Sequence, residues 1–69
     1  MGIRKIKNDI GKKVRELRLD KNLSQEKLAE HVNLSREYIS CIEHGRNSIG
    51  IETLYKFAQF FEVDIKEFF

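Results

Sequence analysis

Apolar residues recur every three or four positions through most of this chain, the spacing that gathers side chains on one face of an α-helix. After Asp9, for example, Ile10, Val14 and Leu17 follow this period. The pattern predicts five helices: a first over residues 9–20, two short ones after Ser24 and Ser35, a fourth over residues 51–62 and a short last one after Asp64. The expected fold class is therefore all-α.

Residues 24–45 contain the most strongly marked pair of helices. Ser24 and Ser35 stand where a hydroxyl can accept from free amides of the first helical turn, and Asn33 tolerates the left-handed backbone of a tight turn. Ala29 is small enough to let the two helices cross closely. The expected inward residues are Leu28, Val32, Leu34, Ile39 and Ile42. This combination is typical of a helix-turn-helix.

Length and charge restrict the alternatives. A chain of 69 residues makes one domain, expected here over residues 9–69 behind a short basic arm at 1–8. Residues 1–46 hold eleven Lys and Arg against seven Asp and Glu, whereas residues 47–69 hold two against four. The single cysteine and the absence of an apolar leader favour a cytoplasmic protein. The basic front half suits contact with phosphates.

The helix after Ser35 turns a polar face away from its inward isoleucines. At 100° per residue this face carries five side chains: Arg36, Glu37, Ser40, Cys41 and His44. An α-helix fits the major groove of DNA, where arginine can contact guanine and a carboxylate can accept from cytosine. Arg36 and Glu37 lie in the first turn, so we expect them to lead base reading, with the other three in support.

Catalytic and metal-binding readings of this segment are weak. Cys41 and His44 have a spacing that suits metal ligands, but two ligands fall short of a structural zinc site, and His31 lies on another helix. Glu43 points away from both, and no glycine-rich oxyanion loop is present. We therefore expect neither an enzyme nor a metal site nor a cofactor.

The same residues resemble the Cro and phage-repressor family of helix-turn-helix proteins, the XRE family. The matching positions are Ser24, Gln25, Leu28, Ala29, Val32, Leu34, Ser35, Ile39, Ser40, Ile42, Glu43 and Gly45. Asn33 departs from the usual glycine, conservatively for the backbone. The resemblance implies a five-helix, lambda repressor-like domain that regulates transcription by binding double-stranded DNA with its third helix in the major groove.

The resemblance also assigns roles to individual residues. Arg18 would pair with Glu43 and brace the first helix against the third. Gln25 would bond a phosphate at the start of the second helix, where free amides favour an anion. The loop after the third helix would supply a second clamp on the DNA backbone through Arg46, Asn47 and Ser48.

The run from Arg36 to Ser40 further resembles controller proteins of restriction-modification systems, which belong to the same family. In such a protein Tyr38 and Ser40 would lie near the DNA backbone or a thymine methyl group. By helical geometry alone, Tyr38 lies between the inward and outward faces, so it could either pack against the core or reach DNA.

Apolar residues at the end of the chain suggest pairing of two copies. Phe60, Ile65, Phe68 and Phe69 would form an exposed patch and a homodimer interface. A two-fold dimer requires a near-palindromic operator with half-sites about 34 Å apart. The alternatives are an antitoxin-like module with autoregulatory DNA binding, and an interaction module that reads no bases. Activation would add a contact with RNA polymerase, for which Glu26 and Glu30 offer an acidic face.

Overall fold

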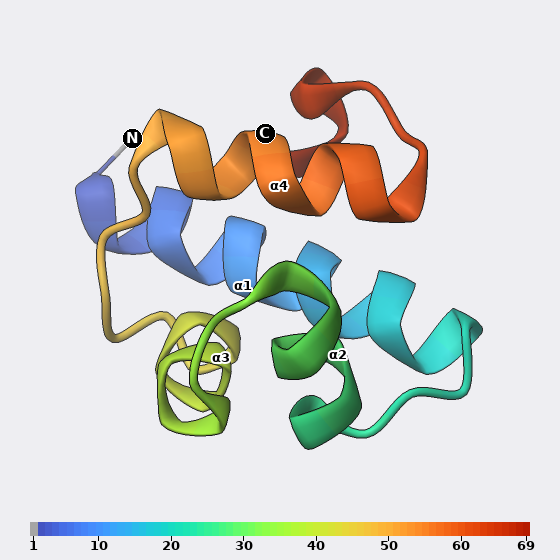
Figure 1. Ribbon diagram of the computed structural model, residues 1–69. Helices are drawn as coiled ribbons and strands as arrows, with labels where there is room; N and C mark the ends of the chain where they lie inside the picture. Colours follow the sequence, from blue (N-terminus) through green and yellow to red (C-terminus); the bar gives the residue numbers. More distant parts are fainter. Residues whose placement is uncertain (1) are drawn as a thin grey trace.

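The computed structural model describes residues 2–69, and these residues form helices joined by short connections (Figure 1). The elements are α1 (Ile3–Asp20), α2 (Gln25–Val32), α3 (Arg36–Glu43), α4 (Ile51–Phe61) and the 3-10 helix η1 (Ile65–Phe68). Within the described part of the chain there is no strand, so the all-α prediction is confirmed. The last of the five expected helices is a single 3-10 turn. None of the described helices is long and apolar enough to cross a membrane.

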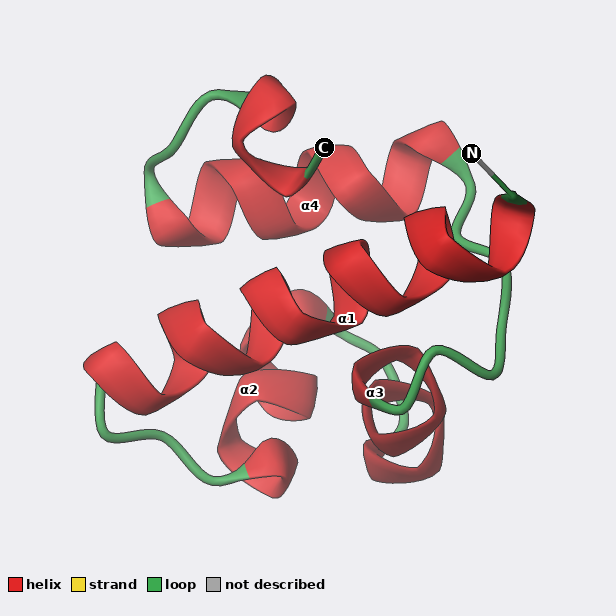
Figure 2. Cartoon of the chain, turned by 180° about the vertical axis from the view of Figure 1, so that it is seen from behind, coloured by secondary structure: helices red, strands yellow, loops and turns green. Residues whose placement is uncertain are grey.

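The longest helix, α1, runs through the middle of the molecule. In Figures 1 and 2, which view it from opposite sides, α4 and the C-terminal turn lie on one side of α1 and the pair α2 and α3 on the other. Contacts link α1 to α3 and η1, and α2 to α3 and α4. Figure 1 looks nearly along the axis of α3, so this helix crosses α1 steeply.

One apolar core joins all five elements. Its most deeply buried side chains are Phe57, Phe68, Leu28, Ile39, Ile42 and Val14. Both isoleucines of α3 are buried on the same side, because they stand three positions apart on the helix. Burial of this face fixes which residues of α3 point outward.

Helix α1 begins earlier than the sequence suggested. It starts at Ile3 and not near Asp9, so residues 3–8 of the expected basic arm are part of the helix. No side chain caps its first turn, which is why no start signal was visible in the sequence. Met1, the first residue of the expected arm, lies outside the described residues.

The four apolar residues predicted to form an exposed patch near the C-terminus differ in burial, so this prediction is corrected. Phe68 is only 1% exposed because η1 turns its ring back into the core. Phe60 and Ile65 are half-buried against the same core, and the Phe60 ring stacks on His31 at 4.9 Å between centroids. Phe69 alone among the four is open, at 72% exposed.

A different apolar group is exposed instead. Ile51 is 67% exposed, because it lies in the first turn of α4, beyond the edge of the core. It lines one shallow hollow with Ile3 and Phe69. The apolar patch of this protein therefore joins the beginnings of α1 and α4 to the C-terminus.

Candidate nucleic-acid interface

The two helices of the motif begin and end as the sequence predicts. The Ser24 hydroxyl accepts from the Lys27 amide and the Ser35 hydroxyl from the Tyr38 amide, both at 3.0 Å. Asn33 adopts the left-handed conformation, with φ 58° and ψ 49°, and ends α2. The capped starts and the tight turn fix the direction in which α3 leaves α2.

The outer face of α3 carries the five side chains that the helical period placed there. Arg36, Glu37 and His44 are exposed, whereas Ser40 and Cys41 are half-buried at the flank. The structure therefore brings all five to one side of one helix, with the charged pair at its beginning. Two turns of helix present a charged end and a smaller polar middle to a partner.

The two leading candidates for base reading contact each other. An Arg36 Nη2 atom lies 3.6 Å from a Glu37 carboxylate oxygen, and the side chains are 54% and 75% exposed. An ion pair this open to water contributes roughly 0–1 kcal/mol. Separating the two groups to contact bases therefore costs little.

His44 ends α3 and has a defined tautomer in this contact. Its Nδ1 atom lies 2.7 Å from the Ser40 carbonyl oxygen. Because a carbonyl oxygen only accepts, Nδ1 must carry the proton and donate it in this contact. The side chain is thereby fixed at the end of the candidate reading face.

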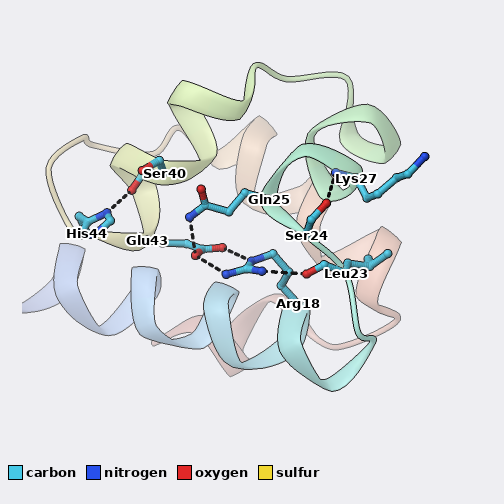
Figure 3. A network of polar contacts seen from close by, with 8 residues as sticks. All are labelled: Arg18, Leu23, Ser24, Gln25, Lys27, Ser40, Glu43 and His44. Carbon is cyan, nitrogen blue, oxygen red and sulfur yellow. Dashed lines mark hydrogen bonds and ion pairs between the residues drawn. The ribbon is translucent and has the colours of Figure 1, made fainter.

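A buried ion pair holds α3 against α1 (Figure 3). Arg18 Nε donates to one carboxylate oxygen of Glu43 at 2.8 Å, and Nη2 donates to the other at 3.0 Å. The two side chains are only 10% and 2% exposed. Arg18 also donates to the Leu23 carbonyl oxygen at 2.7 Å. This two-pronged arrangement is the strongest geometry available to an arginine and a carboxylate, and it ties α1, the α1–α2 connection and α3 together.

Gln25 joins this network, a contact that no local sequence pattern predicts. Its side-chain nitrogen donates to the same Glu43 oxygen that Arg18 Nη2 contacts, at 3.1 Å (Figure 3). An amide nitrogen carries two hydrogens, so one N–H remains free for another acceptor. Gln25 stands at the first position of α2, and its side chain is held in place by Glu43.

The loop after α3 begins with a glycine that the backbone requires. Gly45 has φ +70°, a conformation that side-chain-bearing residues rarely adopt. It turns the chain so that Arg46, Asn47 and Ser48 are exposed next to the end of α3. The three loop residues are thus free to contact a partner of α3. Tyr38, in contrast, is half-buried and packs against the core.

A glycine of α1 that sequence reasoning missed sets the distance between α1 and α3. A Cβ atom at Gly11 would overlap the backbone carbonyl oxygen of Ile42, so glycine is needed for the helices to lie this close. The side-chain amide of Asn8 lies against Gly45, at the start of the loop after α3. A glycine inside a helical pattern is the one available signal, because it costs about 1 kcal/mol relative to alanine unless packing requires it.

Within residues 2–69, no group of three His, Cys, Asp or Glu side chains comes together in a way that could hold a metal ion. Each buried polar side-chain atom in this range has a hydrogen-bond partner. The polar residues around α3 are therefore either satisfied inside the protein or open on its surface.

Comparison with known proteins agrees with this geometry. The helix-turn-helix family model matches residues 14–68. Control protein C.BamHI from Bacillus amyloliquefaciens is 43% identical over 58 residues, which cover 83% of this chain and 72% of the relative. Control protein C.MunI from Mycoplasma sp is 35% identical over 65 residues, which cover 93% of this chain and 88% of the relative.

A solved structure matches the whole chain. The restriction-modification controller protein C.AhdI from Aeromonas hydrophila superimposes with a TM-score of 0.90 at 30% identity, and the match covers 100% of both chains. The resemblance to controller proteins, found first in residues 36–40, therefore extends through sequence and fold. The chain belongs to the helix-turn-helix family of DNA-binding transcriptional regulators.

Proposed function

We propose that this protein binds a near-palindromic operator as a homodimer, with α3 of each subunit in the major groove. The observation that carries the proposal is the outward face of α3, which begins with Arg36 and Glu37 and is held rigid from behind. An arginine and a carboxylate in the first turn are the groups that read guanine and cytosine edges.

The remaining contacts follow from position along α3. Ser40, Cys41 and His44 continue the reading face, with the thiol supplying shape and apolar contact because it is a weak donor. Gln25 and the exposed loop of Arg46, Asn47 and Ser48 clamp the DNA backbone on either side of the groove. The ring of Tyr38 packs against the core, and its hydroxyl group contacts the DNA backbone.

Dimerisation is proposed through the apolar patch at the beginnings of α1 and α4. Ile3, Ile51 and Phe69 are 69%, 67% and 72% exposed and line one hollow. Exposure of these apolar side chains to water is unfavourable, and their burial between two subunits would stabilise a dimer. The partner is a second copy, since a two-fold dimer presents two reading helices to a palindrome. Of the four residues first predicted for this interface, Phe69 belongs to this patch.

The regulated genes are proposed to be those of a restriction-modification system, on the strength of the controller proteins that this chain resembles. As a regulator of transcription the protein would act in the cytoplasm. The contact of Glu26 and Glu30 with RNA polymerase stays a prediction.

The test is selection of duplexes from a randomised pool at near-physiological salt, followed by binding assays on the enriched sequence. We expect a palindrome whose half-sites are about one helical turn apart. Arg36→Ala should relax specificity at one base pair and cost about 1–3 kcal/mol. Arg46→Ala should weaken binding to every sequence alike and lower the salt dependence.

Two results would contradict the proposal. Retention of DNA without an enriched sequence would mean that the protein holds phosphates only. Equal effects of Arg36→Ala and Arg46→Ala on all sequences would remove the division between reading and clamping. An enriched site located upstream of restriction or methylation genes would support the proposed regulated system.

A further inference from the structure

A row of three cationic residues and one asparagine follows one side of α1, beside the candidate interface and outside every contact assigned so far. Arg4, Asn8, Lys12 and Arg15 are spaced four, four and three residues apart, so they lie on one stripe of the helix. From Arg4 to Arg15 the helix rises about 16 Å. We call these four residues the α1 stripe.

The α1 stripe borders the candidate interface along its whole length. Arg4, Asn8 and Lys12 line a shallow hollow that His44 closes at the end of α3. Arg15 lines the next hollow, which it shares with His44 and Gln25. Asn8 also lies against Gly45, directly before the loop that begins with Arg46. The stripe therefore extends from the loop that begins with Arg46 to Gln25, the two proposed contacts with the DNA backbone.

The positive charge of this region is not neutralised within the protein. The two hollows contain five cationic side chains and two carboxylates, Asp9 and Glu43. Asp9 pairs with Lys5 at 3.1 Å and Glu43 with Arg18 at 2.8 Å. Among residues 2–69, the other three cations, Arg4, Lys12 and Arg15, take part in no ion pair.

Stability of the helix does not explain these positions. Arg4 lies in the first turn of α1, where the helix dipole disfavours a cation and where no acidic residue is present. Lys13, on the side of α1 that faces η1, has a partner in Glu67 at 3.8 Å. Three of the four unpaired cations of α1 thus lie on the side that adjoins α3, where close packing at Gly11 brings the two helices together. The fourth, Lys7, lines the hollow of the apolar patch.

We infer that the α1 stripe is a third contact with the DNA backbone, in which Arg4, Lys12 and Arg15 bind phosphates beside the groove that α3 enters. The inference rests on the proposed function, because α3 must enter the groove for α1 to approach the strand. The phosphates of one strand are about 3.4 Å apart along the axis, so the 16 Å stripe can reach several of them. Because it lies beside the groove and contacts phosphates only, its contribution is independent of sequence.

The experiment compares two triple variants with equal loss of charge. Arg4→Gln, Lys12→Gln and Arg15→Gln remove the cations of the stripe. Lys21→Gln, Lys56→Gln and Lys66→Gln remove three exposed lysines that line neither hollow. Binding of each variant and of the original protein is measured over a range of salt, on the selected operator duplex and on a random duplex of the same length. Circular dichroism confirms that each variant is folded.

The stripe variant should lose affinity for both duplexes by the same factor, so its specificity ratio should be unchanged. The slope of log K against log salt should become shallower by roughly 0.9 for each lost phosphate contact, which is about 2.7 per subunit for three contacts. The control variant should keep the original slope. Equal slopes for the stripe and control variants would overturn the inference while leaving the proposed function intact. Failure of the original protein to bind either duplex would overturn both.

Discussion

The two sides of α1 are held by different kinds of interaction. Toward α3, a buried ion pair and a hydrogen-bonded glutamine fix the geometry, and the helices touch at a glycine. Toward α4 and η1, the buried contacts are apolar, and Phe57 and Phe68 fill the interior. The one ion pair on this side, from Lys13 to Glu67, is partly exposed. Both sides contribute buried apolar residues, but only the α3 side adds buried hydrogen bonds of fixed geometry.

This difference suits the two proposed functions, base reading on the α3 side and dimerisation on the α4 side. A reading helix has to be held to within a fraction of an ångström, and hydrogen bonds with fixed geometry do this better than apolar contacts. A dimer surface needs exposed apolar area, and the α4 side leaves Ile51 and Phe69 open. Changes on the two sides of α1 should therefore have different consequences.

The largest effect is expected from breaking the ion pair. Glu43→Ala would leave the Arg18 guanidinium buried without its carboxylate, and loss of one partner of such a pair costs about 3–5 kcal/mol. In a domain this small that is a large part of the free energy of unfolding. Thermal or urea unfolding followed by circular dichroism would measure the loss. The control is Glu37→Ala, on an exposed glutamate of the same helix, which should change stability by less than about 0.5 kcal/mol.

A double change sharpens this test. Replacing both charges, with Arg18→Met and Glu43→Leu, removes the unpaired charge and should recover much of the stability lost in Glu43→Ala. DNA binding should nevertheless stay impaired, since Gln25 loses the acceptor that orients it. An unfolding midpoint for Glu43→Ala equal to that of the original protein would show that the pair is unimportant for stability.

A smaller effect is expected where the two helices touch. Gly11→Ala adds one methyl group that would overlap the Ile42 carbonyl oxygen, and neither backbone can move freely. Overpacking of this kind costs roughly 1–3 kcal/mol, more than the helix propensity that alanine returns. The control is Gly2→Ala, where an added Cβ meets nothing within 4 Å. A variant at Gly11 as stable as the control would mean that the helices are free to separate.

Local features of the sequence predicted part of this structure, and contacts between distant residues account for the rest. The serine caps, Asn33 and the apolar period depend on neighbouring residues, so α2, α3 and the outward face of α3 could be predicted. The start of α1 could not, because no side chain caps it. The bond from Gln25 to Glu43 joins residues 18 positions apart, and no local rule connects them. Phe68 and Phe69 are identical in type, and only the direction of the last turn decides which one is buried.

The smallest change in fold stability is expected on the apolar side, at the exposed patch. Ile51→Ser with Phe69→Ser removes apolar groups that contribute little to the monomer core, so the free energy of unfolding of the monomer should shift by less than about 0.5 kcal/mol for each substitution. The same variant should weaken dimerisation and operator binding together, because the patch loses the surface that pairs. Sedimentation over a range of concentrations would measure the dimer.

Phe60→Ser, at a half-buried ring that lies outside the patch, is the contrasting variant: it should destabilise the fold and leave the dissociation constant of the folded dimer unchanged. A dimer that persists in the double variant but weakens with Phe60→Ser would place the interface around Phe60 and not at the beginnings of α1 and α4.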